Sequence, residues 1–271
     1  MSRHPLLRAT VSGVFRPGIK RRLLAGTRRS LFLCVLVFAV GSGSLSVSAG
    51  EDGLRKVTAE ASNGIEDRKW RYFLYLPPGY VEGDGSYPLY LWLHGRSLRG
   101  TDLEMLRRYG PPAYLEKDRS SPFVTVCPQL EEGAWEPESL VALLDECISK
   151  YHIDPARVLL GGSSLGAMGA WTFAGSYPDR FAALVPICAH GPAWVTEKVV
   201  DLPIRAIHGD ADEIVPIDPH AQLIQQIRDL GGDAELLVVP GGDHGSVIRP
   251  LRKYPEIYDW ALQVTRRVIK E

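Results

Sequence analysis

The segment that most constrains the fold is a glycine-flanked serine between a strand-like run and a helix-like run. Residues 162–166 read Gly-Ser-Ser-Leu-Gly. The strand-like run Arg157–Leu160 precedes them, and the helix-like run Ala167–Ala174 follows. Glycine at both flanks favours a turn too sharp for a side chain at those positions. The sequence therefore predicts a strand, a tight turn and a helix, with Ser164 held at the turn.

The same pattern has a chemical meaning. A G-x-S-x-G pentapeptide between a strand and a helix is typical of the nucleophile elbow of serine hydrolases. The turn places the Ser164 hydroxyl at the helix N-terminus, where free N–H groups and the helix dipole favour developing negative charge. Such pentapeptides also occur by chance in glycine-rich loops, but the flanking strand and helix favour Ser164 as a nucleophile.

The first part of the chain has the composition of an export signal. Residues 1–49 contain eight Lys or Arg residues and no Asp or Glu, and an apolar run extends from Leu31 to Val40. Small residues follow and end at Ala49. A basic segment, a short apolar segment and a small-residue cleavage site describe a secretory signal peptide. The apolar run is short for a membrane span. We expect residues 1–49 to be a signal peptide, residues 50–271 to be one catalytic domain, and the protein to be periplasmic or extracellular.

A twin-arginine pattern within residues 27–32 leaves the export route open. Without the signal peptide, 23 of the 31 basic residues remain against all 32 acidic residues, which gives a formal charge of −9. A domain with this charge has no reason to bind nucleic acid or an anionic membrane. The expected partner is a small-molecule or polymer-borne substrate, with no stable membrane insertion. The sequence leaves the oligomeric state open.

Three cysteines lie in the expected mature domain, namely Cys127, Cys147 and Cys188. An odd number in an exported protein allows one disulfide and a free thiol, or three buried thiols. Buried thiols that pack as small apolar side chains are favoured. No cysteine or histidine spacing resembles a zinc site, so we expect neither a metal nor a cofactor.

Strand-like and helix-like runs alternate from about residue 56 onward. Helix-like segments begin at Pro137, near Asp218 and at Pro255, and each carries apolar residues at helical spacing. The strand-like runs are residues 72–76, which resemble an edge strand, 89–93, 123–127, 157–160, 183–187, 204–207 and 235–239. Alternation of this kind predicts an α/β fold with a doubly wound, mostly parallel sheet.

Functional residues of such a sheet belong in the loops after the carboxyl ends of the strands. Ser164 follows one strand, Asp212 lies in the loop after residues 204–207, and His244 lies in the loop after residues 235–239. The order Ser, Asp, His along the chain is that of α/β-hydrolases, and it differs from that of chymotrypsin-like and subtilisin-like enzymes.

The chain resembles the α/β-hydrolase superfamily from about residue 72 to residue 262. It is most similar to secreted carboxylesterases, dienelactone-hydrolase-like proteins, and polyhydroxybutyrate depolymerase and feruloyl esterase relatives. The motifs that carry the resemblance are Leu76-Pro77-Pro78-Gly79-Tyr80, Leu93-His94-Gly95, the serine pentapeptide, the His-Gly-x-x-Asp motif at residues 208–212 and Gly242-Asp243-His244. The resemblance implies an α/β-hydrolase fold and a serine esterase, and it says little about the natural ester.

In this scheme Ser164 attacks a carbonyl carbon, His244 accepts its proton, and an acid orients the imidazole. Asp212 matches the family position for the acid. Asp210 remains a competitor, although an aspartate there is also suited to capping a turn. Asp243, next to the histidine, is expected to be a loop residue.

An oxyanion hole needs two N–H donors. The resemblance assigns one to Leu165, the residue after the nucleophile, and the other to Arg96 or Ser97. Relatives often carry Gly-x-Gly where this chain has Gly95-Arg96-Ser97, so the second donor stays open. Arg96 could instead contact an anionic substrate group, or simply be solvated.

Other side chains are weaker candidates. Trp135, His190 and Trp194 follow strands on the expected active-site edge and could bind substrate, although tryptophans also pack under loops. His94 and His208 are expected to support their loops. His152 and His220 are expected to lie at the surface.

Only residues 188–202 separate two of the strands, which leaves room for a loop and one short helix but not for a large lid. An open cleft suits soluble or polymer-borne esters. A peptidase related to prolyl oligopeptidase, an acyltransferase, and a non-catalytic binding protein on the same scaffold are the alternatives.

Overall fold

The computed structural model describes residues 48–49, 53–62, 67–83, 86–115, 117–118, 120–249 and 255–265. Most of the expected signal peptide, residues 1–47, lies outside the described residues. Ser48 and Ala49, which the sequence assigns to its end, pair with the second strand.

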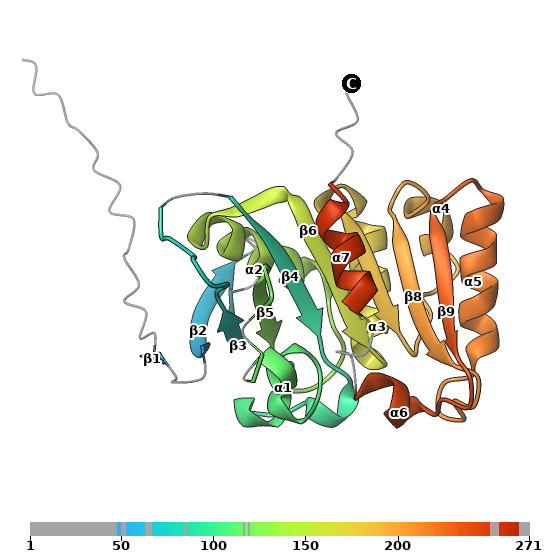
Figure 1. Cartoon of the computed structure of the whole chain (residues 1–271), viewed down its shortest axis with the longest axis horizontal. Helices are drawn as coiled ribbons and strands as arrows, with labels where there is room; N and C mark the ends of the chain where they lie inside the picture. The colour runs from blue at the N-terminus through green and yellow to red at the C-terminus, as the bar shows by residue number, and fades with distance from the viewer. Residues whose placement is uncertain are drawn as a thin grey trace, which may run out of the picture. The chain divides into compact units, whose positions relative to one another are not determined.

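The described strands form one sheet in the order β1-β2-β3-β5-β4-β6-β7-β8-β9 (Figure 1). The first three strands and β5 pair antiparallel, whereas β5, β4, β6, β7, β8 and β9 run parallel to their neighbours. The prediction of a mostly parallel sheet is confirmed. The strands are β1 (Ser48–Ala49), β2 (Leu54–Ser62), β3 (Asp67–Tyr75), β4 (Tyr87–Leu93), β5 (Val124–Pro128), β6 (Ile153–Ser163), β7 (Ala183–Ile187), β8 (Ile204–Gly209) and β9 (Ala234–Val239).

Strand β3 departs from its expected place at an edge, because it pairs with both β2 and β5. Strand β2 was not recognised in the sequence. Its inward positions are Val57, Ala59 and Ala61. Alanine has little strand propensity and gives a weak apolar alternation, so the pattern of β2 is poorly visible in the sequence.

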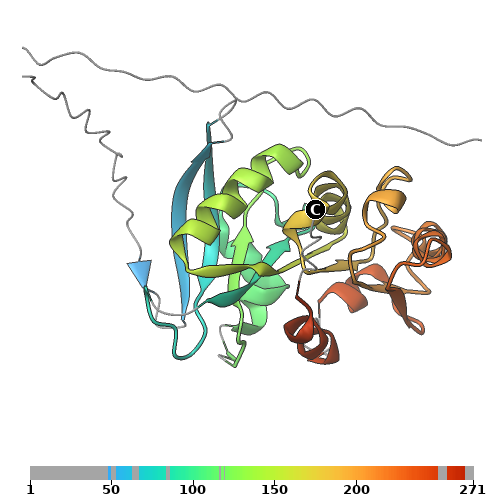
Figure 2. The ribbon, with the colours of Figure 1, turned by 90° about the horizontal axis from the view of Figure 1, so that it is seen from above.

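Helices cover both faces of the sheet (Figure 2). Helices α2, α3 and α5 pack on one face, and α1 and α7 pack on the other (Figures 1 and 2). The helices are α1 (Pro111–Leu115), α2 (Pro137–Lys150), α3 (Leu165–Ser176), α4 (Val195–Lys198), α5 (Ile217–Asp229), α6 (His244–Ile248) and α7 (Pro255–Gln263), with 3-10 turns η1 (Arg96–Leu98), η2 (Leu103–Arg108) and η3 (Pro178–Arg180). None of the helices in the described part of the chain combines the length and the apolar character needed to cross a bilayer.

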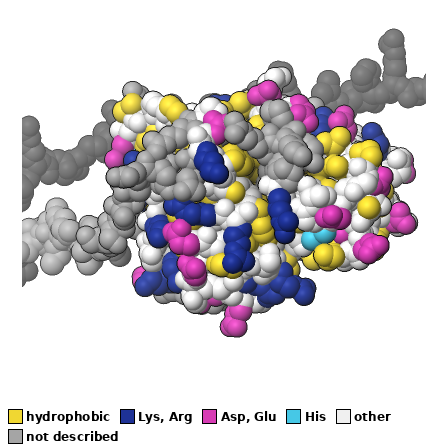
Figure 3. Space-filling view, turned by 60° about the horizontal axis from the view of Figure 1, so that its bottom comes forward, with side chains coloured by type: hydrophobic (Ala, Val, Ile, Leu, Met, Phe, Trp, Pro, Cys, Tyr) yellow, Lys and Arg dark blue, Asp and Glu magenta, His cyan; other side chains and the backbone are white. Residues whose placement is uncertain are grey.

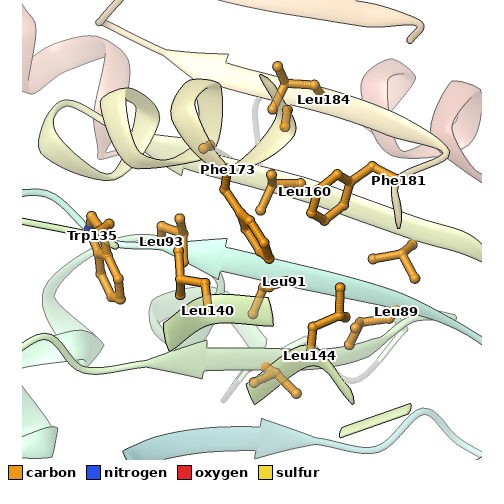
Figure 4. Close-up of a cluster of buried hydrophobic side chains, with 14 of the residues drawn as sticks. Leu89, Leu91, Leu93, Trp135, Leu140, Leu144, Leu160, Phe173, Phe181 and Leu184 are labelled. Atoms are coloured by element: carbon orange, nitrogen blue, oxygen red, sulfur yellow. The ribbon is translucent and has the colours of Figure 1, made fainter. Parts of the chain in front are cut away.

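The central strands are fixed by a core between the sheet and helices α2 and α3. Alternate residues of β4, Leu89, Leu91 and Leu93, are at most 1% exposed and face this layer, together with Leu160 and Phe173 (Figure 4). Burial of each leucine contributes about 1.5–3 kcal/mol. Because Leu93 is aligned with Gly162 across the β4–β6 pair, the core holds the ends of these two strands side by side.

Two further predictions concern the loops and the thiols. The β7–β8 connection carries only the short helix α4, as its length predicted. Cys127, Cys147 and Cys188 are all free and buried, so the arrangement with one disulfide is excluded.

Candidate active site

The serine pentapeptide forms the predicted turn. Ser164 follows β6 directly and caps α3 with φ 53° and ψ −121°, a conformation that costs a residue with a side chain about 1–3 kcal/mol. A Cβ atom on Gly162 would overlap the backbone of Gly166, and one on Gly166 would overlap the carbonyl of Leu93. The two glycines are therefore required by close backbone contact.

The three expected residues meet at one point although they lie far apart in the sequence. Asp212 follows β8 and His244 begins α6, after β9. The Nε2 atom of His244 lies 3.0 Å from Ser164 Oγ, and its Nδ1 atom lies 2.7 Å from Asp212 Oδ2. A carboxylate only accepts, so Nδ1 carries the ring proton and Nε2 is free to accept the hydroxyl proton of Ser164. Such a chain can move a proton from the serine to the imidazole.

Asp212 is buried, with 6% of its surface exposed. Its Oδ1 accepts the backbone N–H groups of Ile214 and Val215, at 3.0 and 2.9 Å. Burial raises the pKa of this carboxyl, but the N–H of Val215, the ring of His244 and the N–H of Ile214 lower it more, so the net pKa lies below its ordinary value. Asp212 is therefore held ionised in a fixed orientation.

The two neighbouring acids have other partners. Asp210 accepts the N–H of Gly241 at 2.6 Å and so joins two loops, and its side chain is exposed. Asp243 caps α6 through a reciprocal pair of bonds with Ser246. Asp212 is thus the acid that contacts His244, and Asp243 acts on the helix that carries the histidine.

A pocket of about 620 Å³ opens over Ser164 and His244. The expected oxyanion residues Leu165, Arg96 and Ser97 all line it, with Leu165 at the first position of α3 and the other two in η1. Apolar walls come from Met168, Ile214 and Ile248. The pocket therefore joins a nucleophile, two backbone segments able to supply N–H donors, and apolar surface for a substrate chain.

His94 supports the loop that carries Arg96 and Ser97. Its Nε2 accepts the N–H of Leu130 at 2.9 Å, so its Nδ1 carries the proton and donates to Gly95 O at 2.7 Å. Burial lowers the pKa of His94 to about 4, which keeps the ring neutral. The role expected for His94 in holding this loop agrees with these contacts.

Tyr109 is a pocket residue that the sequence did not reveal. Its hydroxyl lies 2.9 Å from Ser97 Oγ, and its ring lines the pocket beside Gly95. Burial raises the pKa of the phenol, so it remains a hydrogen-bond donor. Tyr109 follows the short 3-10 turn η2, and no strand end or motif marks it in the sequence.

None of the three candidate substrate-binding residues lines this pocket. Trp135 is 4% exposed, stacks on Trp70 at 6.2 Å between ring centroids and donates from Nε1 to His94 O. It is a support beneath the loop after β4, since its ring fits against Gly169 of α3. The half-buried His190 has its Nδ1 engaged with the carbonyl of the adjacent Gly191.

Trp194 is 51% exposed and lies over a different hollow, beside Glu197 and Leu230. It follows the expected strand but directly precedes α4, and its hollow is bordered by residues of α4 and α5. The pocket over Ser164 therefore does not include Trp135, His190 or Trp194: Trp135 is packed in the core, and Trp194 lies on another surface.

The buried thiol of Cys188 lies beside the acid. Potential ligand atoms of Cys188, Asp212 and His244 fall within 4.8 Å of one another, the kind of group that could hold a metal ion. Burial, and next the charge of Asp212, raise the pKa of this thiol to about 12, and the other two side chains already bond each other. The arrangement fits a hydrogen-bonded catalytic set better than a metal site.

The mouth of the pocket is basic. Arg96 and Arg249 are exposed and both line it, and none of the described residues lining it is acidic. Figure 3 shows this face with several Lys and Arg side chains spread over it, together with Asp and Glu side chains, a partly exposed histidine and apolar side chains. An anionic group on a bound molecule would meet a favourable field here.

Comparison with known proteins agrees with the fold. The phospholipase/carboxylesterase family matches residues 135–257, a segment that includes Ser164, Asp212 and His244. A protein of Nocardia uniformis subsp. tsuyamanensis named as an esterase, NocK, is 29% identical over 170 residues, which cover 57% of this chain and 48% of that protein. Poly(3-hydroxyalkanoate) depolymerase C of Paucimonas lemoignei is 26% identical over 180 residues, or 60% of this chain and 39% of the depolymerase.

Among solved structures, the crystal structure of a thermostable esterase superposes with a TM-score of 0.68 and 26% identity, over 78% of this chain and 63% of that one. The chain spans half or less of the length of the two sequence relatives, NocK and the depolymerase. The sheet order, the glycine-flanked serine turn and these similarities agree on an α/β-hydrolase fold, and the phospholipase/carboxylesterase family is matched over residues 135–257.

Proposed function

We propose that this protein is an exported serine esterase that cleaves carboxylic esters through an acyl-enzyme. The observation that carries the proposal is the continuous hydrogen-bonded chain from Asp212 through His244 to Ser164. Nucleophile, base and acid in contact, with the nucleophile at a helix N-terminus, are the parts that acyl transfer needs.

In the first half-reaction, Ser164 Oγ forms a bond to the ester carbonyl carbon while its proton passes to Nε2 of His244. The carbonyl oxygen becomes an oxyanion, which the N–H of Leu165 and a second N–H from Arg96 or Ser97 stabilise. The bond between the carbon and the alcohol oxygen then breaks, and His244 returns the proton to that oxygen. The acyl group remains on Ser164.

In the second half-reaction, water attacks the acyl carbon as His244 takes one of its protons. The bond to Ser164 Oγ breaks, the proton returns to the serine, and a carboxylic acid leaves. Asp212 stabilises the imidazolium that forms in each step, because its charge faces the Nδ1 proton throughout.

The substrates that suit this site are small esters and esters borne on polymers, namely acylated or feruloylated glycans and hydroxyalkanoates. The short β7–β8 connection, the apolar walls of the pocket and the similarity to a poly(3-hydroxyalkanoate) depolymerase support this proposal.

Export is proposed from the composition of residues 1–49. Determining the N-terminus of the protein secreted by its host tests this, and a mature start near residue 50 is expected.

The test of the activity uses the protein with 4-nitrophenyl esters of increasing acyl length, acetylated and feruloylated glycans, and a polyhydroxyalkanoate film. Ester cleavage that is lost in Ser164→Ala, with a fluorophosphonate probe labelling only the unmodified serine, is the expected result. Peptide amides and added alcohols are run in parallel, because faster amide cleavage would indicate a peptidase, and ester exchange would indicate an acyltransferase. A well-folded protein that the probe does not label would be a binding protein, and the proposal would fail.

A further inference from the structure

Two buried histidines lie behind the acid and take no part in the chain just described. His208 lies in β8 and His220 in α5, and both are 0% exposed. Their Nδ1 atoms are 2.8 Å apart. The sequence placed His220 at the surface, because it lies near the start of a helix. It is instead packed edge-on against the Trp171 ring, on the side of α5 that faces the sheet.

The hydrogen-bond partners assign the protons of this pair. His208 Nε2 lies 2.8 Å from Val215 O, and a carbonyl only accepts, so this nitrogen carries a proton. In a neutral ring His208 Nδ1 is then bare and accepts, so His220 Nδ1 must donate. This leaves the buried Nε2 of His220 without a partner among the described residues. Burial lowers the pKa of His208, and lowers that of His220 to about 3, in agreement with two neutral rings.

The pair borders the catalytic acid directly. His208 Nε2 lies 3.3 Å from Asp212 Oδ2, the same oxygen that accepts Nδ1 of His244 at 2.7 Å. His208 also bonds Val215, whose own N–H binds the other carboxylate oxygen. The loop from residue 212 to residue 215 is therefore fixed in two ways. The Asp212 carboxylate binds the N–H of Val215, and His208 contacts both the Asp212 carboxylate and the carbonyl of Val215.

The titratable groups around the pair are few. His208 faces Asp212, His244 and His220, and His220 faces His208 and His190. Cys188 also lies beside Asp212, with its thiol protonated. If either His208 or His244 were protonated, its positive charge would lie next to the carboxylate of Asp212.

We propose that His220 is a positioning residue: its N–H occupies Nδ1 of His208, keeps that ring uncharged against the acid loop, and reserves the charge of Asp212 for His244. A proton on His208 Nδ1 would face the N–H of His220 at 2.8 Å, and moving the His220 proton to Nε2 would leave a buried N–H without a partner among the described residues, so both arrangements disfavour the charged ring. Without that donor His208 could become an imidazolium 3.3 Å from Asp212 Oδ2, and this second cation would weaken the stabilisation of His244. The inference rests on the proposed esterase function, since it concerns the same acid.

The test compares His220→Asn with His220→Leu. The side-chain amide of asparagine can donate from the position of Nδ1, whereas leucine cannot donate. In His220→Leu no group donates to Nδ1 of His208, so this nitrogen can take up a proton beside Asp212, and the acidic limb of the kcat/KM profile should move to higher pH. His220→Asn should keep the original limb. KM at pH 8 should change little in either variant, because His220 does not line the pocket.

A double variant separates this role from simple packing. In His208→Gln with His220→Leu, the glutamine keeps a donor for Val215 O but cannot take up a proton, so the acidic limb should return to its original position. Thermal unfolding identifies variants that do not fold, and His220→Phe replaces the leucine if that variant fails. An acidic limb that is the same in folded Leu (or Phe) and Asn variants would overturn the inference. Loss of all ester cleavage and probe labelling in the unmodified protein would instead reject the esterase itself.

Discussion

Asp212 Oδ2 lies 2.7 Å from His244 Nδ1, whereas Asp210, two residues earlier, is bonded to Gly241 N on the exposed side of the same loop. The two acids of the His-Gly-x-x-Asp motif therefore have separate tasks. One faces the imidazole, and the other joins the loops that follow β8 and β9.

The first prediction concerns this division. Asp212→Asn should lower kcat by about 10⁴, because the amide no longer provides the charge that orients and stabilises the imidazolium. Asp210→Asn is the matched control and should retain kcat within about threefold. The measurement is kcat on a neutral 4-nitrophenyl ester at saturating substrate. Full activity in Asp212→Asn together with loss in Asp210→Asn would reverse the assignment.

The second prediction concerns the turn. Gly166→Ala places a methyl group against the carbonyl of Leu93, and the backbone must move to accept it. We expect a loss of about 3 kcal/mol in the free energy of unfolding, within the range for overpacked sites, and loss of activity. Gly245→Ala is the control, because its Cβ would meet no atom closer than 3.5 Å. Urea denaturation measures both, and equal stability of the two variants would contradict the close contact.

The third prediction concerns Tyr109. Tyr109→Phe removes the hydroxyl that bonds Ser97 Oγ, and Ser97→Ala removes the other partner. Each should lower kcat about threefold to tenfold, in line with the loss of about 0.5–1.5 kcal/mol for one hydrogen bond. If both act by fixing the loop after β4, the double variant should be no worse than the poorer single variant. Multiplicative effects in this double-mutant cycle would show that the two groups act independently.

The fourth prediction concerns stability in acid. Burial lowers the pKa of His94 to about 4 and of His220 to about 3, whereas both rings titrate near 6.5 when unfolded. At pH values between the folded and the unfolded pKa, the unfolded chain binds more protons than the folded protein. The contribution of the two neutral rings to the free energy of unfolding is therefore fully present above about pH 6.5 and is lost as the pH drops toward 4. Each histidine contributes a slope of about 1.4 kcal/mol per pH unit in that window.

Urea denaturation at a series of pH values measures this slope. His220→Asn should reduce it by the share of one histidine. A stability that is flat between pH 6.5 and 4.5 would be incompatible with neutral buried rings.

The fifth prediction concerns the basic mouth of the pocket. Arg96 and Arg249 are expected to favour esters that carry a carboxylate, such as 4-nitrophenyl hydrogen succinate, over the neutral pentanoate of similar size. Substituting both by glutamine should lower the ratio of the two kcat/KM values about fivefold to tenfold at low salt, because an exposed pair contributes up to about 1 kcal/mol. Arg108→Gln, which lies outside the pocket, is the control. A ratio unaffected by these changes and by salt would show that both arginines are only solvated.

The sequence predicts the sheet and its catalytic edge because these depend on short-range patterns. Buried parallel strands are continuous apolar runs. The residues after them, Ser164, Asp212 and His244, come together because the carboxyl ends of β6, β8 and β9 lie at the same edge of one parallel sheet. The glycines of the turn are likewise local requirements.

The side chains that failed as predictions depend on contacts between distant segments. Trp135 follows a strand on the expected edge, but whether it faces the pocket or the core is decided by its stacking on Trp70. His220 lies in the first turns of an amphipathic helix, and its burial depends on Trp171 and on His208 as a partner. Tyr109 enters the pocket from a turn with no periodicity at all. No local pattern records such pairings.

The modest length of helix α4 bears on the pattern of products. A four-residue helix is all that lies between β7 and β8, so with a polyester as the proposed substrate, the polymer chain would continue past the cleaved bond without being threaded. Attack would then begin at internal positions of the chain as well as at its ends. Early samples from a polyester should therefore contain a spread of oligomer lengths, with a rapid fall in mean chain length before monomers accumulate.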